Sequence, residues 1–218
     1  MRFSIATIAL FSLLQCLEAA PAGNILPRQN TRNDLQNGAC KKYTLIFARG
    51  TAEPAGNLGS VGAPFAAALE DVLGDDLAVQ GVAYAASIQG AISGDPVGNK
   101  AMAAWVAKAC GSTKIILGGY SQGAQLTHGA VRLMSASDAK KIDAIVTFGD
   151  PKKGKAYKKK ALNAKTKTYC HAGDTICSVS CKKTNIACLQ KNMQIKPAHK
   201  TYPDDVKAAA RWVKSMVG

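Results

Sequence analysis

A serine in a tight turn is the first candidate for chemistry in this sequence. Ser121 stands in the pattern Gly119-Tyr120-Ser121-Gln122-Gly123, between an apolar run at 114–118 and a stretch with helical spacing at 124–134. A strand that turns sharply into a helix through Gly-x-Ser-x-Gly exposes the serine hydroxyl above the helix N-terminus, where negative charge is favoured. The pattern therefore predicts a nucleophilic serine.

A serine nucleophile needs a base to take its proton, and histidine is the usual one. His128 lies two turns down the helix that follows the serine and should point away from the turn. His171 directly follows a cysteine, so a disulfide there would restrict its movement. His199 lies in a loop after Pro197, just before the last helix. In folds where a strand runs into a helix through such a serine turn, the usual chain order is serine, acid, histidine, and this order favours His199 as the base.

The acid that orients the histidine should then lie between positions 121 and 199. The aspartates in this interval are Asp138, Asp143, Asp150 and Asp174. The first two fall at the end of a helix and at the wrong end of a strand. Asp150 follows the apolar run Ile142–Phe148 and is a rival on geometry. Asp174 lies in the loop between Cys170 and Cys177, where a disulfide would hold it after a strand, and it is slightly favoured.

The elements that position these residues alternate between strands and helices along the chain. Strands are predicted at 43–48, 77–85, 114–118, 142–148 and 166–170, helices at 61–73, 100–110 (with Trp105 on the inner face), 124–134 and 204–217, and a loop at 90–98. This alternation indicates an α/β fold with a mostly parallel sheet covered by helices on both faces. In such sheets the functional site lies at the carboxyl ends of the strands, where the serine turn is predicted.

The N-terminal segment resembles an export signal. Arg2 precedes an apolar stretch at 5–14, and small residues follow with a processing site near Ala19–Ala22. We therefore expect residues 1–20 to be a signal peptide, 21–38 a flexible polar arm and 39–218 a single catalytic domain. Removal of the leader leaves about 195 of the 218 residues, which suits one domain, and it predicts a secreted, extracellular protein.

Loss of Cys16 with the leader leaves six cysteines, an even number that favours disulfides in an oxidising compartment. Six cysteines allow 15 pairings. Spacing narrows them to Cys40–Cys110, Cys170–Cys177 and Cys181–Cys188. A metal site is disfavoured because there is no Cys-x-x-Cys pair, and neither a metal nor a cofactor is expected.

Positive charge is concentrated in the second half of the chain. Residues 140–218 hold 18 basic and 5 acidic side chains, a net charge of +13 (18 − 5), out of +14 for the whole chain. The densest run is Lys152–Lys160. Such a surface attracts polyanions, although a solvated basic face is the simpler interpretation. The aromatic residues are not interleaved with the lysines, so no specific nucleic-acid binding is predicted.

Five segments together carry a family resemblance. They are Ala48-Arg49-Gly50-Thr51-Ala52-Glu53, Gly56-Asn57-Leu58-Gly59, Gly119-Tyr120-Ser121-Gln122-Gly123-Ala124, Cys170-x-x-Gly173-Asp174-x-Ile176-Cys177, and His199 with Tyr202-Pro203-Asp204. In order and spacing the chain resembles a secreted fungal cutinase, of the family that also includes acetylxylan esterases. The resemblance covers nearly the whole chain after the leader.

The resemblance implies a compact α/β-hydrolase without a lid and assigns Ser121, Asp174 and His199 to a catalytic triad. It also implies an oxyanion hole built from the backbone N–H groups of Thr51 and Gln122, aided by the Thr51 hydroxyl. The same resemblance places Cys40 opposite Cys110 and Cys170 opposite Cys177.

The residues expected to line the substrate cleft are Ile92, Val97, Tyr120, Ile195 and Pro197. Members of the resembled family present apolar side chains around the histidine, so Lys196 and Lys200 are a departure from that pattern. A further departure is an insertion at 178–198 that holds Cys181 and Cys188. The leading hypothesis is a monomeric serine esterase acting on short- to medium-chain esters in a polymer such as cutin. The alternatives are an acetylxylan-type polysaccharide deacetylase and a cationic factor that binds walls or membranes through Lys152–Lys160.

Overall fold

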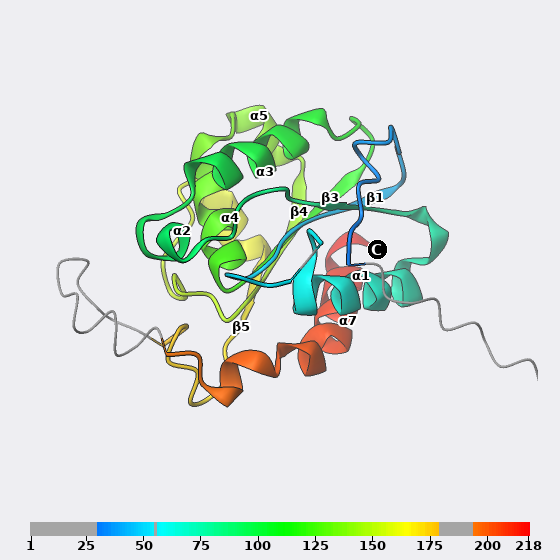
Figure 1. The fold of residues 1–218 in the computed structure, drawn as a ribbon. Coiled ribbons are helices and arrows are strands. Elements are labelled where there is room, and N and C mark those ends of the chain that lie inside the picture. The colour runs from blue at the N-terminus through cyan, green and yellow to red at the C-terminus, as the bar shows by residue number, and fades with distance from the viewer. Residues whose placement is uncertain (1–29, 55, 179–193) are drawn as a thin grey trace, which may run out of the picture.

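A five-stranded sheet lies at the centre of the molecule (Figure 1). The computed structural model describes residues 30–54, 56–178 and 194–218. The order across the sheet is β2-β1-β3-β4-β5, and every neighbouring pair is parallel. The strands are β1 (Tyr43–Ala48), β2 (Leu77–Gly81), β3 (Lys114–Tyr120), β4 (Ile142–Phe148) and β5 (Thr166–Tyr169). The predicted parallel α/β architecture is confirmed.

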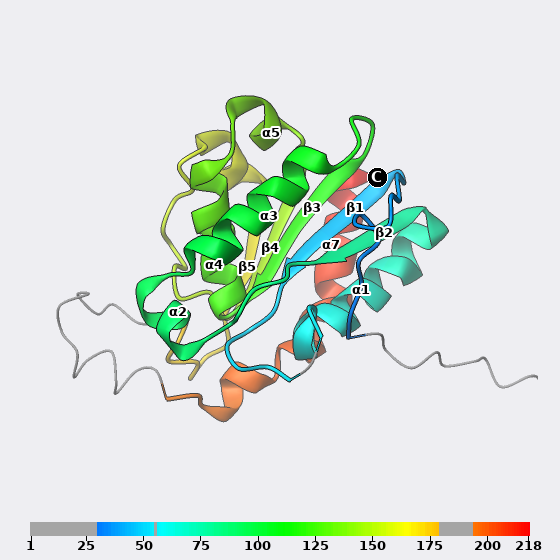
Figure 2. The same ribbon diagram turned by 45° about the horizontal axis from the view of Figure 1, so that its top comes forward.

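The inner strands are apolar on both faces because helices cover both sides of the sheet. All six residues of β1 are buried. Helices α1 (Gly59–Leu73) and α7 (Val206–Val217) lie on one face, and Figure 2 shows α3 (Pro96–Lys108) and α4 (Gln122–Leu133) on the other. The short helix α5 (Ala136–Lys140) then leads into β4. No helix in the described part of the chain is long and apolar enough to cross a membrane.

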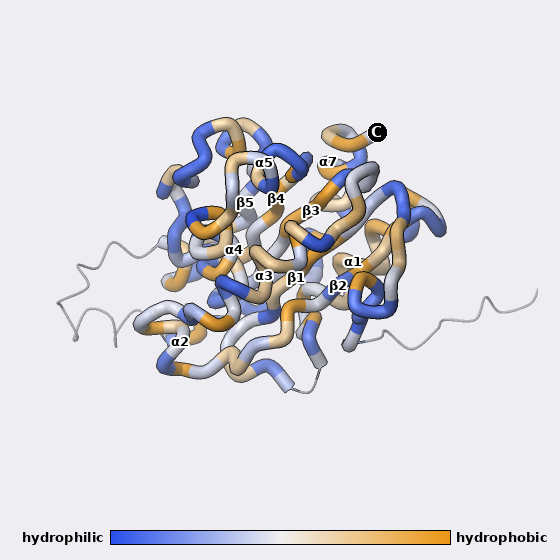
Figure 3. The backbone as a smooth tube through the Cα atoms, turned by 90° about the horizontal axis from the view of Figure 1, so that it is seen from above, coloured by the Kyte–Doolittle hydropathy of each residue, from blue (hydrophilic) through white to orange (hydrophobic). Residues whose placement is uncertain are grey.

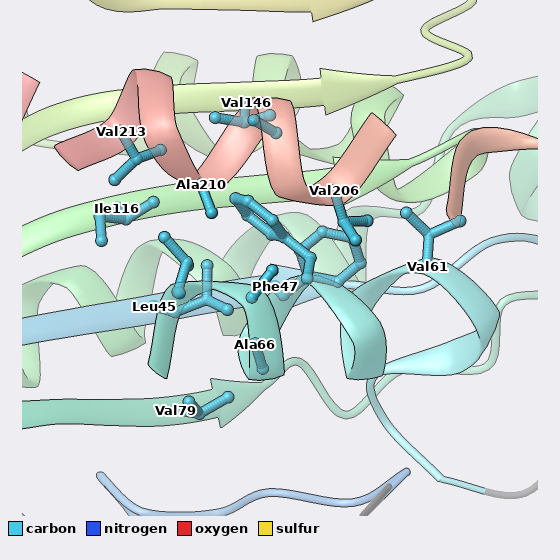
Figure 4. Close-up of a cluster of buried hydrophobic side chains, with 14 of the residues drawn as sticks. Leu45, Phe47, Val61, Ala66, Val79, Ile116, Val146, Val206, Ala210 and Val213 are labelled. Atoms are coloured by element: carbon cyan, nitrogen blue, oxygen red, sulfur yellow. The ribbon is translucent and has the colours of Figure 1, made fainter. Parts of the chain in front are cut away.

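Helix α7 shows how sequence spacing produces this layering. Its buried residues recur at helical intervals, so one apolar stripe faces the sheet while the lysines face solvent. They are Val206, Ala209, Ala210, Val213 and Val217. Figure 4 shows Val206, Ala210 and Val213 beside side chains of β1, β3 and β4 in one cluster. In Figure 3 the hydrophobic stretches follow the central strands, and the hydrophilic ones lie mainly on the outer loops.

The predicted loop at 90–98 is wrong in part, because two helices share this segment. Helix α2 (Ile88–Ser93) begins after Ser87, whose side chain accepts a hydrogen bond from the Gly90 N–H. Helix α3 begins with proline at its first position, after Asp95 has capped it in the same way. These N-caps outweigh the weak helix propensity of the glycine and proline residues.

Residues 30–38 differ from the expected flexible arm, since they are held against the domain. Asp34 donates its N–H to the Val79 carbonyl and accepts the Val79 N–H on its carboxylate. Arg32 forms ion pairs of 2.7 Å with both Asp34 and Glu70. A disulfide between Cys40 and Cys110 fastens the chain just before β1, across 70 residues.

Candidate active site

Ser121 occupies a strained turn between β3 and α4. Its φ of 55° lies in the left-handed region, which costs energy for a residue with a side chain and is typical of a nucleophile elbow. A Cβ on Gly119 would lie 2.3 Å from the Gly123 carbonyl group, and one on Gly123 would lie 2.0 Å from the Ala48 carbonyl oxygen. The turn can therefore close only because both flanking positions are glycine.

His199 connects the serine to a buried carboxylate. Its Nε2 lies 2.9 Å from Ser121 Oγ, and its Nδ1 lies 2.8 Å from Asp174 Oδ2. Both His199 and Asp174 are almost completely buried. With the imidazole proton on Nδ1, facing the carboxylate, Nε2 is left to accept the hydrogen of the serine hydroxyl. This arrangement can make Ser121 a nucleophile.

Asp174 is kept ionised by the donors around it. Burial alone would raise the pKa of this carboxyl group, but hydrogen bonds from His199 and Tyr202 outweigh burial and hold its pKa below the ordinary value. The Tyr202 hydroxyl donates to Asp174 Oδ2 at 2.5 Å, and the Ile176 N–H donates to Oδ1 at 2.9 Å. The Cys170–Cys177 disulfide closes the loop that carries this aspartate.

The rival acid Asp150 is paired with a different histidine. Its Oδ2 lies 3.0 Å from His128 Nε2, and its Oδ1 accepts the Lys152 N–H at 2.8 Å. The His128 ring stacks on Tyr157 with centroids 4.1 Å apart. His128 therefore points away from the serine turn, as its position on the helix predicted, and it is buried.

The third histidine is also engaged away from the serine. His171 Nε2 lies 2.6 Å from Asp205 Oδ2, its Nδ1 lies 2.9 Å from Thr201 Oγ1, and its ring stacks on Tyr202. The structure therefore brings only His199 of the three described histidines to Ser121.

The two residues expected to form the oxyanion hole lie together beside Ser121. Thr51 follows β1, and Gln122 is the first residue of α4; the Thr51 hydroxyl donates to Gln122 Oε1 at 3.0 Å. Within the described residues, neither backbone N–H has a hydrogen-bond partner. Both N–H groups are therefore available to an anion, and the α4 N-terminus adds a favourable dipole.

The Gln122 side-chain amide affects what the Thr51 hydroxyl can do. Gln122 Nε2 is buried without a partner among the described residues. If the amide turns by 180°, Nε2 donates to Thr51 Oγ1, and the hydroxyl hydrogen is then free to reach an oxyanion. The orientation of the Gln122 amide thus decides whether the Thr51 hydroxyl hydrogen is taken up by Gln122.

Exposed apolar residues lie at the same end of the sheet as Ser121. Ile92 is 50% exposed, Val97 71% and Ile195 56%, and Pro197 is also exposed. Ile88, on α2 and 65% exposed, belongs with them and was missed because the segment that begins at residue 90 was predicted to be a loop. Figure 2 shows α2 and the segment after residue 194 at the carboxyl end of the sheet.

Tyr120 has a different place from the one expected. This side chain is only 7% exposed, and its hydroxyl donates to the His199 carbonyl at 2.7 Å. The Tyr120 hydroxyl thus holds the backbone of the turn that carries His199. Tyr202 belongs to one of the family motifs, but its contact with Asp174 was not predicted, because nothing in its spacing reveals that contact. The predicted Cys181–Cys188 pair lies outside the described residues.

Comparison with known proteins gives consistent results. The sequence model of the cutinase family matches residues 39–217. The chain is 42% identical over 205 residues to a cutinase of Monilinia fructicola, covering 92% of this chain and 90% of that protein. It is 36% identical over 223 residues to a cutinase of Coprinopsis cinerea, covering 100% of both.

Solved structures agree on the fold. Trichoderma reesei cutinase in complex with a phosphonate inhibitor matches with a TM-score of 0.73 and 37% identity, covering 88% of this chain and 81% of that chain. An acetylxylan esterase matches with a TM-score of 0.62 and 21% identity, covering 83% of this chain and 100% of that chain. At that identity the second likeness bears on the fold alone.

Proposed function

This chain belongs to the cutinase family, and we propose that it is a serine esterase that hydrolyses carboxylic esters in a polymer, with cutin as the substrate. The observation that carries the proposal is the continuous chain of contacts from Ser121 Oγ through His199 to Asp174, with distances of 2.9 and 2.8 Å. A phosphonate inhibitor on the related Trichoderma reesei protein is consistent with ester chemistry in this family.

In the first half of the proposed reaction, Ser121 Oγ attacks the ester carbonyl carbon while His199 Nε2 takes the hydroxyl proton. Asp174 stays ionised and stabilises the imidazolium that forms. The negative charge on the carbonyl oxygen is stabilised by the N–H groups of Thr51 and Gln122. His199 then gives its proton to the alcohol oxygen, the C–O bond breaks, and the acyl group remains on the serine.

In the second half, a water molecule attacks the acyl-enzyme. His199 takes a proton from the water, and the same two N–H groups stabilise the second oxyanion. Collapse of this intermediate returns the proton from His199 to Ser121 Oγ and releases the carboxylic acid. No other reactant is consumed.

The apolar rim supports an acyl chain of some length as the substrate group. Ile88 and Ile92 on α2 and Ile195 before the histidine turn offer exposed aliphatic surface, which favours a hydrocarbon chain over water. Lys196 and Lys200 are exposed beside Ile195 and add a polar edge. That edge keeps deacetylation of a polysaccharide as the second candidate.

The deciding experiment compares hydrolysis of p-nitrophenyl acetate, butyrate and a long-chain ester, together with release of hydroxy acids from cutin. Ser121→Ala should lower kcat by at least about 10³-fold, whereas Ser215→Ala, which changes an exposed serine on α7, should have no effect. Preference for butyrate or longer esters supports the cutinase proposal. Strict preference for acetate would favour polysaccharide deacetylation, and activity that survives in Ser121→Ala would overturn the triad.

We further propose that the protein is secreted as a monomer after removal of residues 1–20. In this proposal, residues 21–38 lead into the catalytic domain at 39–218. The segment Lys152–Lys160 is proposed to contact an anionic surface. The family match over 39–217 supports the domain boundary. N-terminal sequencing of protein from the culture medium tests the cleavage site. A first residue outside the range 20–23 would contradict it.

A further inference from the structure

The connection from β4 into β5 is a second chemically distinctive region. Residues 151–169, here called the lysine segment, contain eight lysines and no carboxylate. The segment includes a 3₁₀ helix at Lys160–Lys165 and strand β5. Because the side chains cannot neutralise one another, this region keeps a strong positive potential that other residues must offset or a ligand must meet.

The first hollow on this segment lies beside the His128–Asp150 pair. It has a volume of about 280 Å³. Its lining includes three lysines and the stacked rings of His128 and Tyr157; the lysines are Lys152, Lys153 and Lys155. Asp150 is its only described carboxylate; it is 1% exposed and already bonded to His128 and to the Lys152 backbone. The accessible charge in the hollow is therefore positive.

The second hollow lies between the 3₁₀ helix and α5 and has a volume of about 260 Å³. Its floor is apolar and consists of alanine side chains from α5 and the lysine segment together with Leu162. Four lysines stand around this floor: Lys140, Lys159, Lys160 and Lys165. Lys165 has a partial partner in Asp143, 3.8 Å away. A group that fits here must combine an apolar face with a negatively charged edge.

The two hollows are lined by neighbouring parts of the chain, with Thr166 in the first lining and Lys165 in the second. Lysines line both hollows, so a ligand that contacts both must carry repeated negative charges, as a polymer does. Lysine is suited to such a ligand because its ammonium group is a point charge on a flexible stem that does not impose one planar geometry.

The chemistry of the walls distinguishes among polyanions. Single-stranded nucleic acids need exposed aromatic platforms for their bases. Tyr157, the aromatic residue that the lysine segment contributes to the first hollow, is buried, and no aromatic residue among those described lines the second hollow. Insertion into a membrane needs large apolar side chains that enter between lipids, yet Leu162 is buried too. Sugar rings have apolar C–H faces and can carry carboxylates on their edges, which matches the second hollow.

We infer that the lysine segment, with Lys140, forms a binding site for a carboxylate-bearing polysaccharide chain, a polyuronate. The inference extends the anionic contact proposed above and does not depend on the ester chemistry. The site also lies close to the triad, because a Cβ on Gly149 would lie 2.7 Å from His199 Cε1, and the next residue, Asp150, lines the first hollow. A bound polyuronate would thus hold the protein on a polymer surface with its serine nearby.

The test is binding of the secreted protein, purified from the culture medium, to polygalacturonate at several salt concentrations, with neutral dextran as the polymer control. Lys153→Gln/Lys155→Gln/Lys160→Gln removes three charges from the site. The matched control, Lys100→Gln/Lys207→Gln/Lys214→Gln, removes three exposed lysines from α3 and α7. We expect the site variant to lose at least about tenfold in affinity at 0.1 M salt and to show a shallower salt dependence, because fewer counterions are released.

Several results would overturn the inference. Equal losses in both triple variants would mean that only net charge matters. Tighter segment-dependent binding to single-stranded DNA, to anionic lipid vesicles or to a sulfated polysaccharide than to polygalacturonate would assign the surface to that partner instead. Hydrolysis of p-nitrophenyl butyrate is measured in parallel and should be unchanged in both variants, so that failure of this site is distinguished from failure of the esterase proposal.

Discussion

Tyr202 stands directly behind the proposed triad, and its hydroxyl group allows a sharp test of how Asp174 is held. The side chain is fully buried. Its hydroxyl donates to Asp174 Oδ2 at 2.5 Å and accepts the His171 backbone N–H at 3.1 Å. Substitution Tyr202→Phe keeps the ring and removes only the oxygen atom, so it deletes one donor to the carboxylate with little change in packing.

The expected effect is larger on stability than on catalysis. A hydrogen bond to a charged group contributes about 1.5–3 kcal/mol to folding, so Tyr202→Phe should lower the free energy of unfolding by this amount at pH 7. Asp174 is ionised both in the resting enzyme and in the transition state of the proposed mechanism. Most of the lost interaction is therefore common to both states, and kcat/KM should fall by less than about tenfold.

The effect should also depend on pH with a defined sign. Burial raises the pKa of Asp174, but the bonds from His199 and Tyr202 outweigh it, so the folded pKa lies below the unfolded value of about 3.9. Such a group contributes stability above the unfolded pKa, and the contribution is lost as the pH falls through the folded pKa. Removing the Tyr202 donor raises the folded pKa. The difference in unfolding free energy between the wild type and Tyr202→Phe should therefore have its full size above about pH 5 and become smaller below about pH 4.

The assay is urea denaturation of the wild type and two variants at pH 7 and pH 3. Tyr120→Phe is the matched control, because that buried hydroxyl donates to a neutral acceptor, the His199 carbonyl, at 2.7 Å. It should cost about 0.5–1.5 kcal/mol at both pH values. Equal, pH-independent losses in the two variants would refute the reasoning.

Three further changes separate the roles of residues at the site. Asp174→Asn should lower kcat by about 10⁴-fold, whereas Asp150→Asn should destabilise the protein and leave kcat within a few-fold of the wild-type value. If Asp150→Asn caused the larger loss of kcat in an ester assay, Asp150 and not Asp174 would be the acid of the triad. Gly123→Ala should prevent the elbow from closing, because the added Cβ would lie 2.0 Å from the Ala48 carbonyl oxygen; soluble protein with unchanged circular dichroism would contradict this. Thr51→Val should lower kcat by about 10²-fold and Thr51→Ser should not; equal rates would show that the hydroxyl has no part.

Continuous apolar runs made the sheet easy to predict from the sequence. Strands β1 and β4 have the predicted bounds because each is buried on both faces and ends in a loop of different composition. The segment at 90–98 was less predictable. Its glycine and proline residues indicated a loop, but Ser87 and Asp95 cap two helices there. A serine or aspartate three residues before the N–H that it caps is a signal for the start of a helix, and here it outweighs the low helix propensity of the glycine and proline residues.

The choice between Asp150 and Asp174 shows what sequence alone could not decide. Asp150 follows β4 and Asp174 follows β5, so both carboxylates lie at the carboxyl ends of neighbouring strands. Each is buried and each has a histidine partner at 3.0 Å or less. What distinguishes them is the position of the histidine, and that depends on how the helices pack.

His128 is carried by α4, the helix that starts at the serine turn, and its pairing with Asp150 turns the ring toward Tyr157. His199 comes from the segment before α7, on the opposite face of the sheet, and reaches Ser121 over the strand ends. Two acid–histidine pairs thus share one sheet edge without being interchangeable, since only the second has a ring nitrogen within hydrogen-bond distance of the nucleophile. A serine turn and a set of aspartates in the sequence predict that a triad can exist. Which aspartate–histidine pair belongs to that triad depends on the face of the sheet from which each histidine approaches the serine.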